Sequence, residues 1–305
     1  MAERAPFDGE QRDEKEEKAR LEQNALRTNN HILTQDFSDE YGNKYWAKFK
    51  TEHFDSGVSR FAFKGTLRGS GPKKDQQCVV KVFKDEFAKD IDLWVPDLYT
   101  SIRAKELCKE FNDEHVSTLR LAEAPVKMEF VLPMLARVDE TTMNNSATAL
   151  RKNKKIAKQE FVAIEQFIEG EYVKFNSNAG YEQQELSELM PAFTHWTWER
   201  TARKMMVCDL QGVKRKEGNV THYILTDPAI HSVEETFGLT DCGATGMYKV
   251  LTAHRCNDIC KQLQLEDTSV LRLMLLVELL KNTGTTYNFQ LTENEKKMNE
   301  LEKRK

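Results

Sequence analysis

Two apolar runs in the chain end abruptly in polar residues whose side chains could bind a metal ion. Residues 205–208 (MMVC) are followed by Asp209 and Gln211, and residues 223–225 (YIL) are followed, one residue later, by Asp227. Carboxylate and amide oxygens suit Mg²⁺, which binds one or two protein groups together with substrate phosphates. In an extended chain Asp209 and Gln211 would share a face, so one could hold metal while the other orients a hydroxyl nucleophile. Alternatively, Asp209 closes a turn and Asp227 starts one.

A lysine inside an apolar strand is the second candidate for chemistry. Lys81 stands in the middle of the run VVKVF. Such a lysine either points to solvent or reaches across the sheet toward an anion. Backbone amides of a glycine-containing loop can approach a phosphate, and glycines occur upstream at Gly57, Gly65 and Gly69. Because their spacing matches neither a P-loop nor a dinucleotide-binding fingerprint, a phosphate site at Lys81 is one of two open interpretations.

A third set of residues offers soft metal ligands. The run AHRCNDIC contains His254, Cys256 and Cys260. Structural zinc takes four nitrogen or sulfur ligands, so a fourth must come from elsewhere, and His195 in FTHWTWE is one candidate. On an unbroken helix Cys256 and Cys260 would share a face and His254 would point elsewhere, so a common ion requires the helix to begin near Cys256. The alternative is two buried free thiols and a surface histidine.

The elements that must position these residues can be placed from hydrophobic periodicity. Strands are predicted at 60–69, 77–84, 126–135 and 161–168, the first two joined as a hairpin by a turn containing Gly, Pro and Lys. Helices are predicted at about 97–116, 185–202 and 244–264. The polar stretch 144–160 is predicted to be an exposed loop. This order indicates a sheet-rich lobe followed by a mixed lobe.

Composition narrows the classes of function. A net charge of −4 over 305 residues gives no reason to expect nucleic-acid binding. The longest apolar stretch, 270–280, is interrupted by charges and too short to span a bilayer, so we expect a packed helix at about 268–281 and no membrane span. Six cysteines without a predicted signal peptide suit a reducing compartment, and we expect a cytoplasmic protein. Residues 1–28 are predicted to be a disordered charged leader, and 286–305 a polar helical tail.

Taken together, these stretches resemble the atypical α-kinases, the group that includes myosin heavy chain kinases, elongation-factor kinases and channel-kinases. The resemblance covers about residues 45–264 and rests, in this order, on GVSRFAFKG, VVKVFK, IEQFIEGEYVKFNSNAG, FTHWTWERT, DLQGV, LTDPAIHS, FGLTDCGATGM and HRCNDIC. The conventional kinase signatures HRD, DFG and APE are absent, as in that family. The resemblance implies an α+β, two-lobed atypical protein kinase fold. A catalytic domain at 29–285 would comprise a sheet-rich N-lobe (about 29–165) and a mixed, zinc-stabilised C-lobe (about 166–285).

The family's assignments, carried over to matching positions, imply ATP- and Mg²⁺-dependent phosphorylation of a Ser or Thr hydroxyl in a protein substrate. Lys81 would hold the α- and β-phosphates of ATP, and Arg60 would be a further phosphate contact. Glu165 would lie in the hinge and contact adenine, and Asp209 would engage the substrate hydroxyl. The metal ligands would be Gln211 and Asp227 for Mg²⁺, and His195, His254, Cys256 and Cys260 for a structural Zn²⁺.

Two departures from the family pattern stand out. The interval 213–225 between the two presumed Mg²⁺ ligands is longer than usual, and the sequence does not give its course. The second departure is in the loop at 238–243, called the glycine loop below, which in the family would help to engage the substrate. Thr240 stands where the middle glycine is expected, while Gly238 and Gly243 are kept, so the change would bear on peptide preference more than on ATP binding.

Two rival functions follow from the same residues: a nucleotide-binding pseudokinase used as an interaction module, and a zinc-stabilised scaffold that binds no nucleotide. The retained Lys81, Asp209, Gln211 and Asp227 argue against the pseudokinase, whereas the longer 213–225 interval favours it mildly. Autophosphorylation in Mg-ATP would distinguish the kinase from the pseudokinase.

Overall fold

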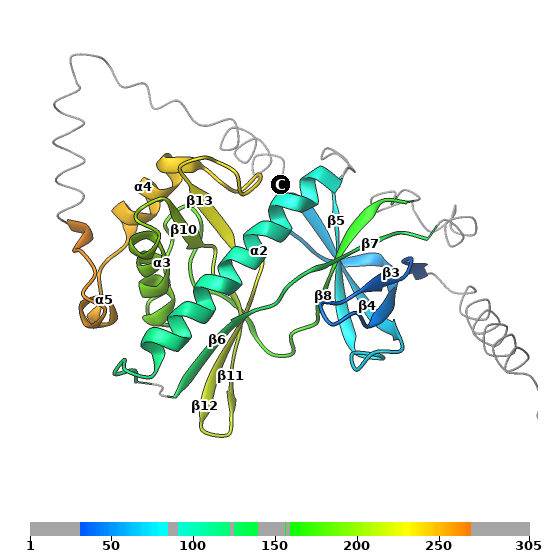
Figure 1. Ribbon diagram of the computed structural model, residues 1–305, viewed down its shortest axis with the longest axis horizontal. Helices are drawn as coiled ribbons and strands as arrows, with labels where there is room; N and C mark the ends of the chain where they lie inside the picture. Colours follow the sequence, from blue (N-terminus) through cyan, green and yellow to red (C-terminus); the bar gives the residue numbers. More distant parts are fainter. Residues whose placement is uncertain (1–30, 85–90, 123–124, 140–155, 157–158, 270–305) are drawn as a thin grey trace, which may run out of the picture.

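The computed structural model describes residues 31–84, 91–122, 125–139, 156 and 159–269. Figure 1 shows two lobes, with the N-terminal strands gathered at one end, helices α3 to α5 at the other, and the long helix α2 running between them. The α+β, two-lobed expectation is therefore confirmed. The predicted leader, the predicted C-terminal tail and most of the expected loop and apolar helix lie outside the described residues. Among the helices that are described, none is long and apolar enough to cross a membrane.

The first lobe is a seven-stranded sheet with the order β1-β3-β4-β5-β8-β7, in which β2 also pairs with β3. Its strands are β1 (His31–Leu33), β2 (Phe37–Ser38), β3 (Lys44–Ser56), β4 (Arg60–Gly69), β5 (Gln77–Phe83), β7 (Met134–Arg137) and β8 (Phe161–Gln166). The predicted hairpin is confirmed as β4–β5, with Ala62 opposite Lys81. Successive side chains of a strand alternate between faces. Val80 and Val82 therefore enter the core of this lobe, while Lys81 faces the other way.

The second lobe contains a four-stranded sheet, a two-stranded ribbon and three helices. The sheet has the order β6-β12-β11-β9, and the ribbon pairs β10 with β13. The strands are β6 (Val126–Phe130), β9 (Tyr172–Lys174), β10 (Met205–Cys208), β11 (Gln211–Glu217), β12 (Val220–Thr226) and β13 (Ala229–Ser232). The helices are α3 (Leu189–Arg200), α4 (Gly243–Ala253) and α5 (Asp258–Gln262). One apolar cluster, which includes Phe111 of α2, Phe193 of α3 and Leu225 of β12, joins the helices α2 and α3 to the sheet. Helix α4 packs in a second cluster with Trp198 and Met206.

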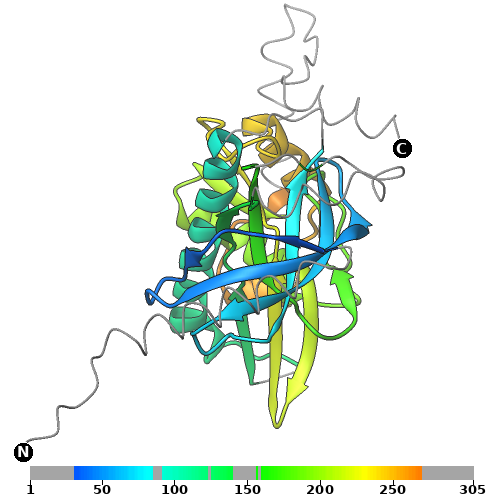
Figure 2. The same cartoon turned by 90° about the vertical axis from the view of Figure 1, so that its right-hand side faces the viewer.

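Helix α2 (Ile91–Phe111) begins six residues before its predicted start, and a π-helical turn (Asn112–Val116) follows it. Proline is favoured at the first helical position, so the local sequence favours a helix start near Pro96. Instead Trp94 is buried against Phe83, with ring centroids 4.3 Å apart, and its Nε1 donates to the Phe161 carbonyl at 3.1 Å. Tertiary burial of Trp94 thus stabilises a helical turn that the local sequence does not favour. Figure 2 shows β3 crossing the front of the molecule and α2 lying along one side.

The predicted single strand at 126–135 is wrong, because the chain divides it between the two lobes. β6 lies parallel to β12 in the second sheet, with Val126 opposite Thr221, whereas β7 is antiparallel to β8 in the first sheet. Pro133 lies between them and has no backbone N–H to give to a ladder. The crossing places this segment under the cavity described below.

The interval 213–225, whose course the sequence left open, is a β-hairpin. β11 and β12 pair in unbroken antiparallel register from Glu217 opposite Val220 to Gln211 opposite Thr226. Gly218, with φ of +61°, lies in the tight turn between the strands. The hairpin brings its two ends together, so Gln211 and Asp227 are neighbours whatever its length.

The predicted single helix at 244–264 is also wrong. It is two helices, α4 and α5, separated at His254–Asn257. Asn257 caps α5, its side chain accepting from the backbone N–H groups of Ile259 at 3.0 Å and Cys260 at 3.1 Å. The break near Cys256 is the one that a shared metal ion requires.

Candidate functional site

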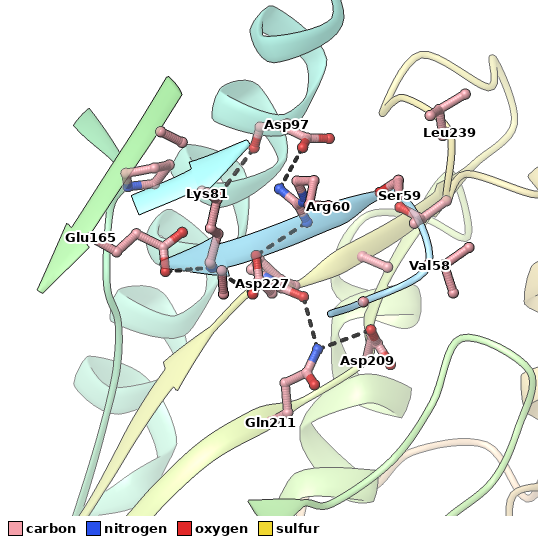
Figure 3. Close-up of a pocket in the computed structure, with 18 of the residues that line it drawn as sticks. Val58, Ser59, Arg60, Lys81, Asp97, Glu165, Asp209, Gln211, Asp227 and Leu239 are labelled. Atoms are coloured by element: carbon pink, nitrogen blue, oxygen red, sulfur yellow. Dashed lines mark hydrogen bonds and ion pairs between the residues drawn. The ribbon is translucent and has the colours of Figure 1, made fainter. Parts of the chain in front are cut away.

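A cavity of about 340 Å³ lies between the lobes, and all of the residues predicted for nucleotide, Mg²⁺ and catalysis line it. The first lobe contributes Arg60, Lys81 and Glu165, and the second contributes Asp209, Gln211 and Asp227 (Figure 3). These residues come from β4, β5, β8, the ends of β10 and β12, and the start of β11. The structure therefore brings together all six residues that the resemblance assigned to nucleotide, Mg²⁺ and catalysis.

Lys81 reaches across the sheet to anions. Its side chain is 8% exposed, and its Nζ lies 2.6 Å from Glu165 Oε2 and 2.5 Å from Asp227 Oδ2. The interpretation in which this lysine points to solvent is thereby excluded. Glu165 also accepts a short hydrogen bond from the hydroxyl of Thr226.

Arg60 makes Asp227 the centre of an ion-pair chain. Its guanidinium donates to Asp227 Oδ1 at 3.2 Å and to Asp97 Oδ2 at 2.6 Å. Burial alone would raise the pKa of Asp227, but the charges of Lys81 and Arg60 outweigh burial and hold that pKa below its usual value. Asp227 is thus held in its ionised form, which is the form that a carboxylate ligand of a divalent metal must take.

Asp209 lies across the cavity mouth from Lys81 and has different partners. Its Oδ1 lies 2.6 Å from Lys174 Nζ, and its Oδ2 accepts from Gln211 Nε2 at 3.0 Å. Gln211 Nε2 also approaches the carbonyl of Asp227 at 3.3 Å, which leaves the amide oxygen Oε1 as the atom to bind a cation. Burial raises the pKa of Asp209, although Lys174 opposes the shift. A carboxyl group with a raised pKa is suited to accept a proton.

Both acidic residues have backbone conformations that non-glycine residues rarely adopt. Asp209 has φ of +57° and Asp227 has φ of +51°. Asp and Asn tolerate this left-handed region better than most side chains, but it is not the extended strand that the sequence analysis assumed. The chain turns at Asp209 between β10 and β11, so the turn interpretation is confirmed, and the residue at this turn also lines the cavity.

Two residues in the cavity wall were missed in the sequence analysis. Asp97 is in α2, and an acidic residue near a helix start is ordinarily explained by the helix dipole, so no signal pointed to it. Lys174 is on β9, two positions after Tyr172, and both residues lie inside the motif IEQFIEGEYVKFNSNAG that was quoted for the resemblance. Residues two apart on a strand share a face, so this spacing could have indicated that both line the cavity.

The glycine loop forms one wall of the mouth. Leu239 and Thr240 line the cavity, and the loop packs on α2, where Thr100 donates to the Phe237 carbonyl at 3.3 Å. Asp241 is fully buried and accepts from Ser232, from the Phe237 N–H and from the Gly243 N–H, which fixes the course of the loop. A buried carboxylate that accepts this many hydrogen bonds makes the loop a preformed wall.

The four predicted zinc ligands converge in the second lobe. The ligand atoms of His195, His254, Cys256 and Cys260 all lie within 4.8 Å of one another. Cys256 Sγ is 3.8 Å from His195 Nδ1, and Cys260 Sγ is 3.5 Å from His254 Nε2. His254 is 2% exposed, so the alternative of a surface histidine beside two free thiols is wrong.

The donor set fits a tetrahedral zinc ion. In a tetrahedral site with metal–ligand bonds of about 2.0–2.3 Å, the ligand atoms lie roughly 3.3–3.8 Å from one another. The Cys256–His195 and Cys260–His254 distances of 3.8 and 3.5 Å fall in this range. The other ring nitrogen of each histidine meets a carboxylate: His254 Nδ1 is 2.6 Å from Glu182, and His195 Nε2 is 3.2 Å from Glu199. Carboxylates in this position orient metal-bound histidines. The arrangement is closed, since four protein ligands leave no position for a substrate.

Comparisons with known proteins agree with this geometry. The model of the alpha-kinase family matches residues 55–260. The chain belongs to the alpha-kinase family. Alpha-protein kinase 1 of Dictyostelium discoideum is 32% identical to this alpha-kinase over 218 residues, which are 71% of this chain and 14% of that protein. The eukaryotic elongation factor 2 kinase of Caenorhabditis elegans is 42% identical over 105 residues, 34% of this chain and 13% of that protein.

Solved structures show the same fold. The inactive alpha-kinase domain of myosin-II heavy chain kinase A complexed with ATP matches with a TM-score of 0.58 and 22% identity, covering 78% of this alpha-kinase and 97% of that chain. The same domain in complex with AMP-PNP gives the same four values. This alpha-kinase spans about one seventh of the length of the two curated relatives named above.

Proposed function

We propose that this alpha-kinase is an ATP- and Mg²⁺-dependent serine/threonine protein kinase. The observation that carries the proposal is the 2.5 Å contact between Lys81 Nζ and Asp227 Oδ2, two residues 146 positions apart that meet inside one cavity. In a kinase, a cation that binds the phosphates and a carboxylate that binds the metal must both reach one triphosphate, and this contact places the two side chains close enough to do so. That a similar fold has been solved with ATP supports the same ligand here.

The triphosphate would occupy the side of the cavity where Lys81 and Arg60 lie. Both cations are held by carboxylates, and phosphate oxygens would replace part of that pairing. Mg²⁺, when bound by Asp227 and the Gln211 amide oxygen, would supply the remaining charge neutralisation. Glu165 is turned toward Lys81 and would orient its ammonium group. We also propose that Glu165 contacts the adenine of ATP, as the resemblance implies.

The acceptor hydroxyl would approach from the Asp209 side. Asp209 would accept the hydroxyl proton as the new oxygen–phosphorus bond forms, while the bond from the γ-phosphorus to the bridging oxygen breaks and ADP leaves. Lys174 and Gln211 each hold one oxygen of this carboxylate, which fixes its direction before substrate binds. Positioning of this kind supplies most of the catalysis in phosphoryl transfer.

We further propose that His195, His254, Cys256 and Cys260 hold a structural zinc ion in the second lobe. Zinc would join α3 to α5 and to the connection before it, since His195 lies in α3, Cys260 in α5, and the other two ligands between α4 and α5. The structure describes all six cysteines and places none of them in a disulfide, which suits the reducing environment of a cytoplasmic protein. The partners of this kinase would be proteins that present a serine or threonine.

The test is incubation of the protein with labelled Mg-ATP and mixed Ser and Thr peptides, beside an Asp209→Asn variant. Asn keeps the size of the side chain and tolerates the left-handed backbone, but it cannot take up the proton. We expect peptide labelling by the natural protein and loss of it in the variant. Absence of labelling and of autophosphorylation in the natural protein, with ATP still bound, would instead indicate the pseudokinase.

A further inference from the structure

Strand β9 is an open edge of the second sheet, next to the proposed catalytic aspartate. Among the described strands it pairs with β11 alone, with Lys174 opposite Gln211 and Tyr172 opposite Val213. An edge strand presents unpaired N–H and C=O groups to any extended chain that can reach it. Whether β9 can pair in this way depends on which of its backbone groups face outward and on which side chains lie beside them.

The register of the β9–β11 ladder shows which backbone groups of β9 face outward. The Phe175 N–H donates to the Leu210 carbonyl at 2.9 Å, so in this antiparallel ladder the hydrogen-bonded positions of the strand are Phe175 and Val173. The alternate positions, Lys174 and Tyr172, direct their N–H and C=O groups away from β11. The open edge therefore offers two donors and two acceptors at the spacing of a β-ladder.

The side chains of the same two residues lie on the cavity side. Tyr172 and Lys174 both line the cavity, whereas Val173 packs against the core of the lobe. Tyr172 is 51% exposed and the Lys174 side chain 46%, so the edge is accessible. Lys174 Nζ lies 2.6 Å from Asp209, which places this edge within one side-chain length of the carboxylate that would accept the hydroxyl proton.

We propose that the substrate protein binds as an extended segment that adds antiparallel to the open edge of β9, with the acceptor Ser or Thr opposite Lys174. This inference rests on the proposed kinase function and names how its substrate is held. Residues opposite each other in a ladder share a face and have Cα atoms about 5.5 Å apart when hydrogen-bonded. The acceptor side chain would therefore project to the cavity side, alongside the Lys174 side chain that reaches Asp209.

The same register assigns the neighbours of the acceptor. The residue two positions after it would lie opposite Tyr172, where a β-branched or aromatic side chain makes a favourable cross-strand pair with an aromatic ring. The residue between them would face away from the cavity. Main-chain bonds would thus supply affinity and Tyr172 would supply selectivity, as in other cases of strand addition.

The competing interpretation is a protected edge. Short edge strands and edge lysines commonly prevent pairing with other chains. Here, however, the charged end of Lys174 is directed at Asp209 and not along the edge, so it does not shield the outward backbone groups.

The decisive test uses the natural protein and a set of N-methylated peptides. A Thr peptide that the protein phosphorylates is remade with a single backbone N-methyl group at the acceptor, or at one, two or three positions after it. Strand addition predicts an alternating pattern. Methylation at the acceptor and at the second position should raise the peptide KM about tenfold, because each loses a ladder bond and adds a clash, whereas methylation at the first and third positions should change it less than about twofold.

A flat scan, or an effect largest at the first position, would overturn the β9 proposal while leaving the kinase function intact. A protein that phosphorylates neither the unmodified peptide nor itself would overturn both, so the two failures are distinguishable.

A pair of variants tests the protein side of the same bond. Tyr172→Pro removes an outward N–H without touching the ladder to β11, and Tyr172→Ala removes the same ring while keeping the N–H. The peptide KM should be several-fold higher for the Pro variant than for the Ala variant, with equal KM for ATP in the two. Equal peptide KM values in two folded variants would contradict the proposed backbone contact.

Discussion

The charged cavity and the His/Cys cluster are both polar sites within the protein, but they differ in how completely their groups are satisfied by one another. In the cavity, Lys81 is buried while Asp227 keeps a side-chain exposure of 24%, and open volume remains beside them. In the cluster, His195 and Cys260 are each 1% exposed, and four ligand atoms face one point. The difference implies that the first site would exchange partners when a nucleotide enters, whereas the second, if it holds the proposed zinc ion, would keep that ion for a structural role.

The largest expected effect is therefore on stability and comes from the cluster. Cys260→Ser removes one of the four proposed zinc ligands, and structural zinc contributes about 10–16 kcal/mol to the folding of small zinc domains. We expect insoluble protein or a collapse of the thermal transition, together with loss of zinc in metal analysis. Cys78→Ser is the matched control, since Cys78 is equally buried in the first lobe but has no metal-binding neighbours, and it should cost about 1–3 kcal/mol. Soluble, active Cys260→Ser protein without zinc would contradict the structural role.

The next effect is on activity and comes from the cavity. Lys81→Met should lower kcat/KM by at least about 10²–10³, the usual result of removing one preorganised charge partner of a transition state. Lys64→Met is the matched control, because Lys64 lies on the neighbouring strand, is exposed and contacts the ring of Phe54. Its activity should stay within about twofold of the natural protein. Equal rates for the two variants would remove Lys81 from the nucleotide site.

A smaller effect separates the two acidic residues of the cavity by the sign of their pH dependence. The pKa of Asp209 is raised in the folded protein by burial, so its charge opposes folding at neutral pH. Asp209→Asn should therefore raise the thermal midpoint at pH 7, and the gain should vanish as the pH falls below the usual value of 3.8. The left-handed backbone, which Asn tolerates well, acts in the same direction.

Asp227 should behave in the opposite way. Its pKa is held below 3.8 against the effect of burial by Lys81 and Arg60, so its charge stabilises the fold above that value. Asp227→Asn should lower the midpoint at pH 7, and the difference should shrink as the pH falls through the lowered pKa. Melting curves of both variants from pH 3 to 8 measure these changes. A change in thermal midpoint of the same sign for both variants at pH 7 would contradict the contrast between the two aspartates.

The smallest effect concerns Lys174. Its half-exposed ammonium group lowers the pKa of Asp209 below the value that burial alone would set. Lys174→Met should shift the acidic limb of the pH–kcat profile to higher pH while leaving the folded protein intact. An unchanged limb would mean that Lys174 does not act through Asp209.

Much of the site could be predicted from the sequence because its residues stand at the ends of apolar strands and in recognisable motifs. Lys81 between valines, and Gln211 and Asp227 at the ends of two strands, all reached the cavity as expected. The β11–β12 hairpin between Gln211 and Asp227 could not be predicted, because its polar residues are typical of a loop. Its register brings Gln211 next to Asp227.

The remaining misses have a common physical cause, which is that tertiary contacts override local preference. Burial of Trp94 extends α2, and the division of 126–135 between two sheets depends on partners that are about 30 or more residues away. The break at His254–Asn257 was required by the metal-ligand argument but is not visible in hydrophobic periodicity, because Val250, Leu251 and Ile259 continue the apolar pattern through it.

Titration of ATP into the protein with and without Mg²⁺ tests most directly whether Lys81 and Asp227 serve one nucleotide. Lys81→Met should weaken ATP binding but keep its dependence on Mg²⁺, whereas Asp227→Asn should abolish the Mg²⁺ dependence, since it removes a metal ligand and not a phosphate contact. Tight, Mg²⁺-dependent ATP binding by a folded Asp227→Asn variant would show that the metal is held elsewhere and that the two residues do not form a shared site.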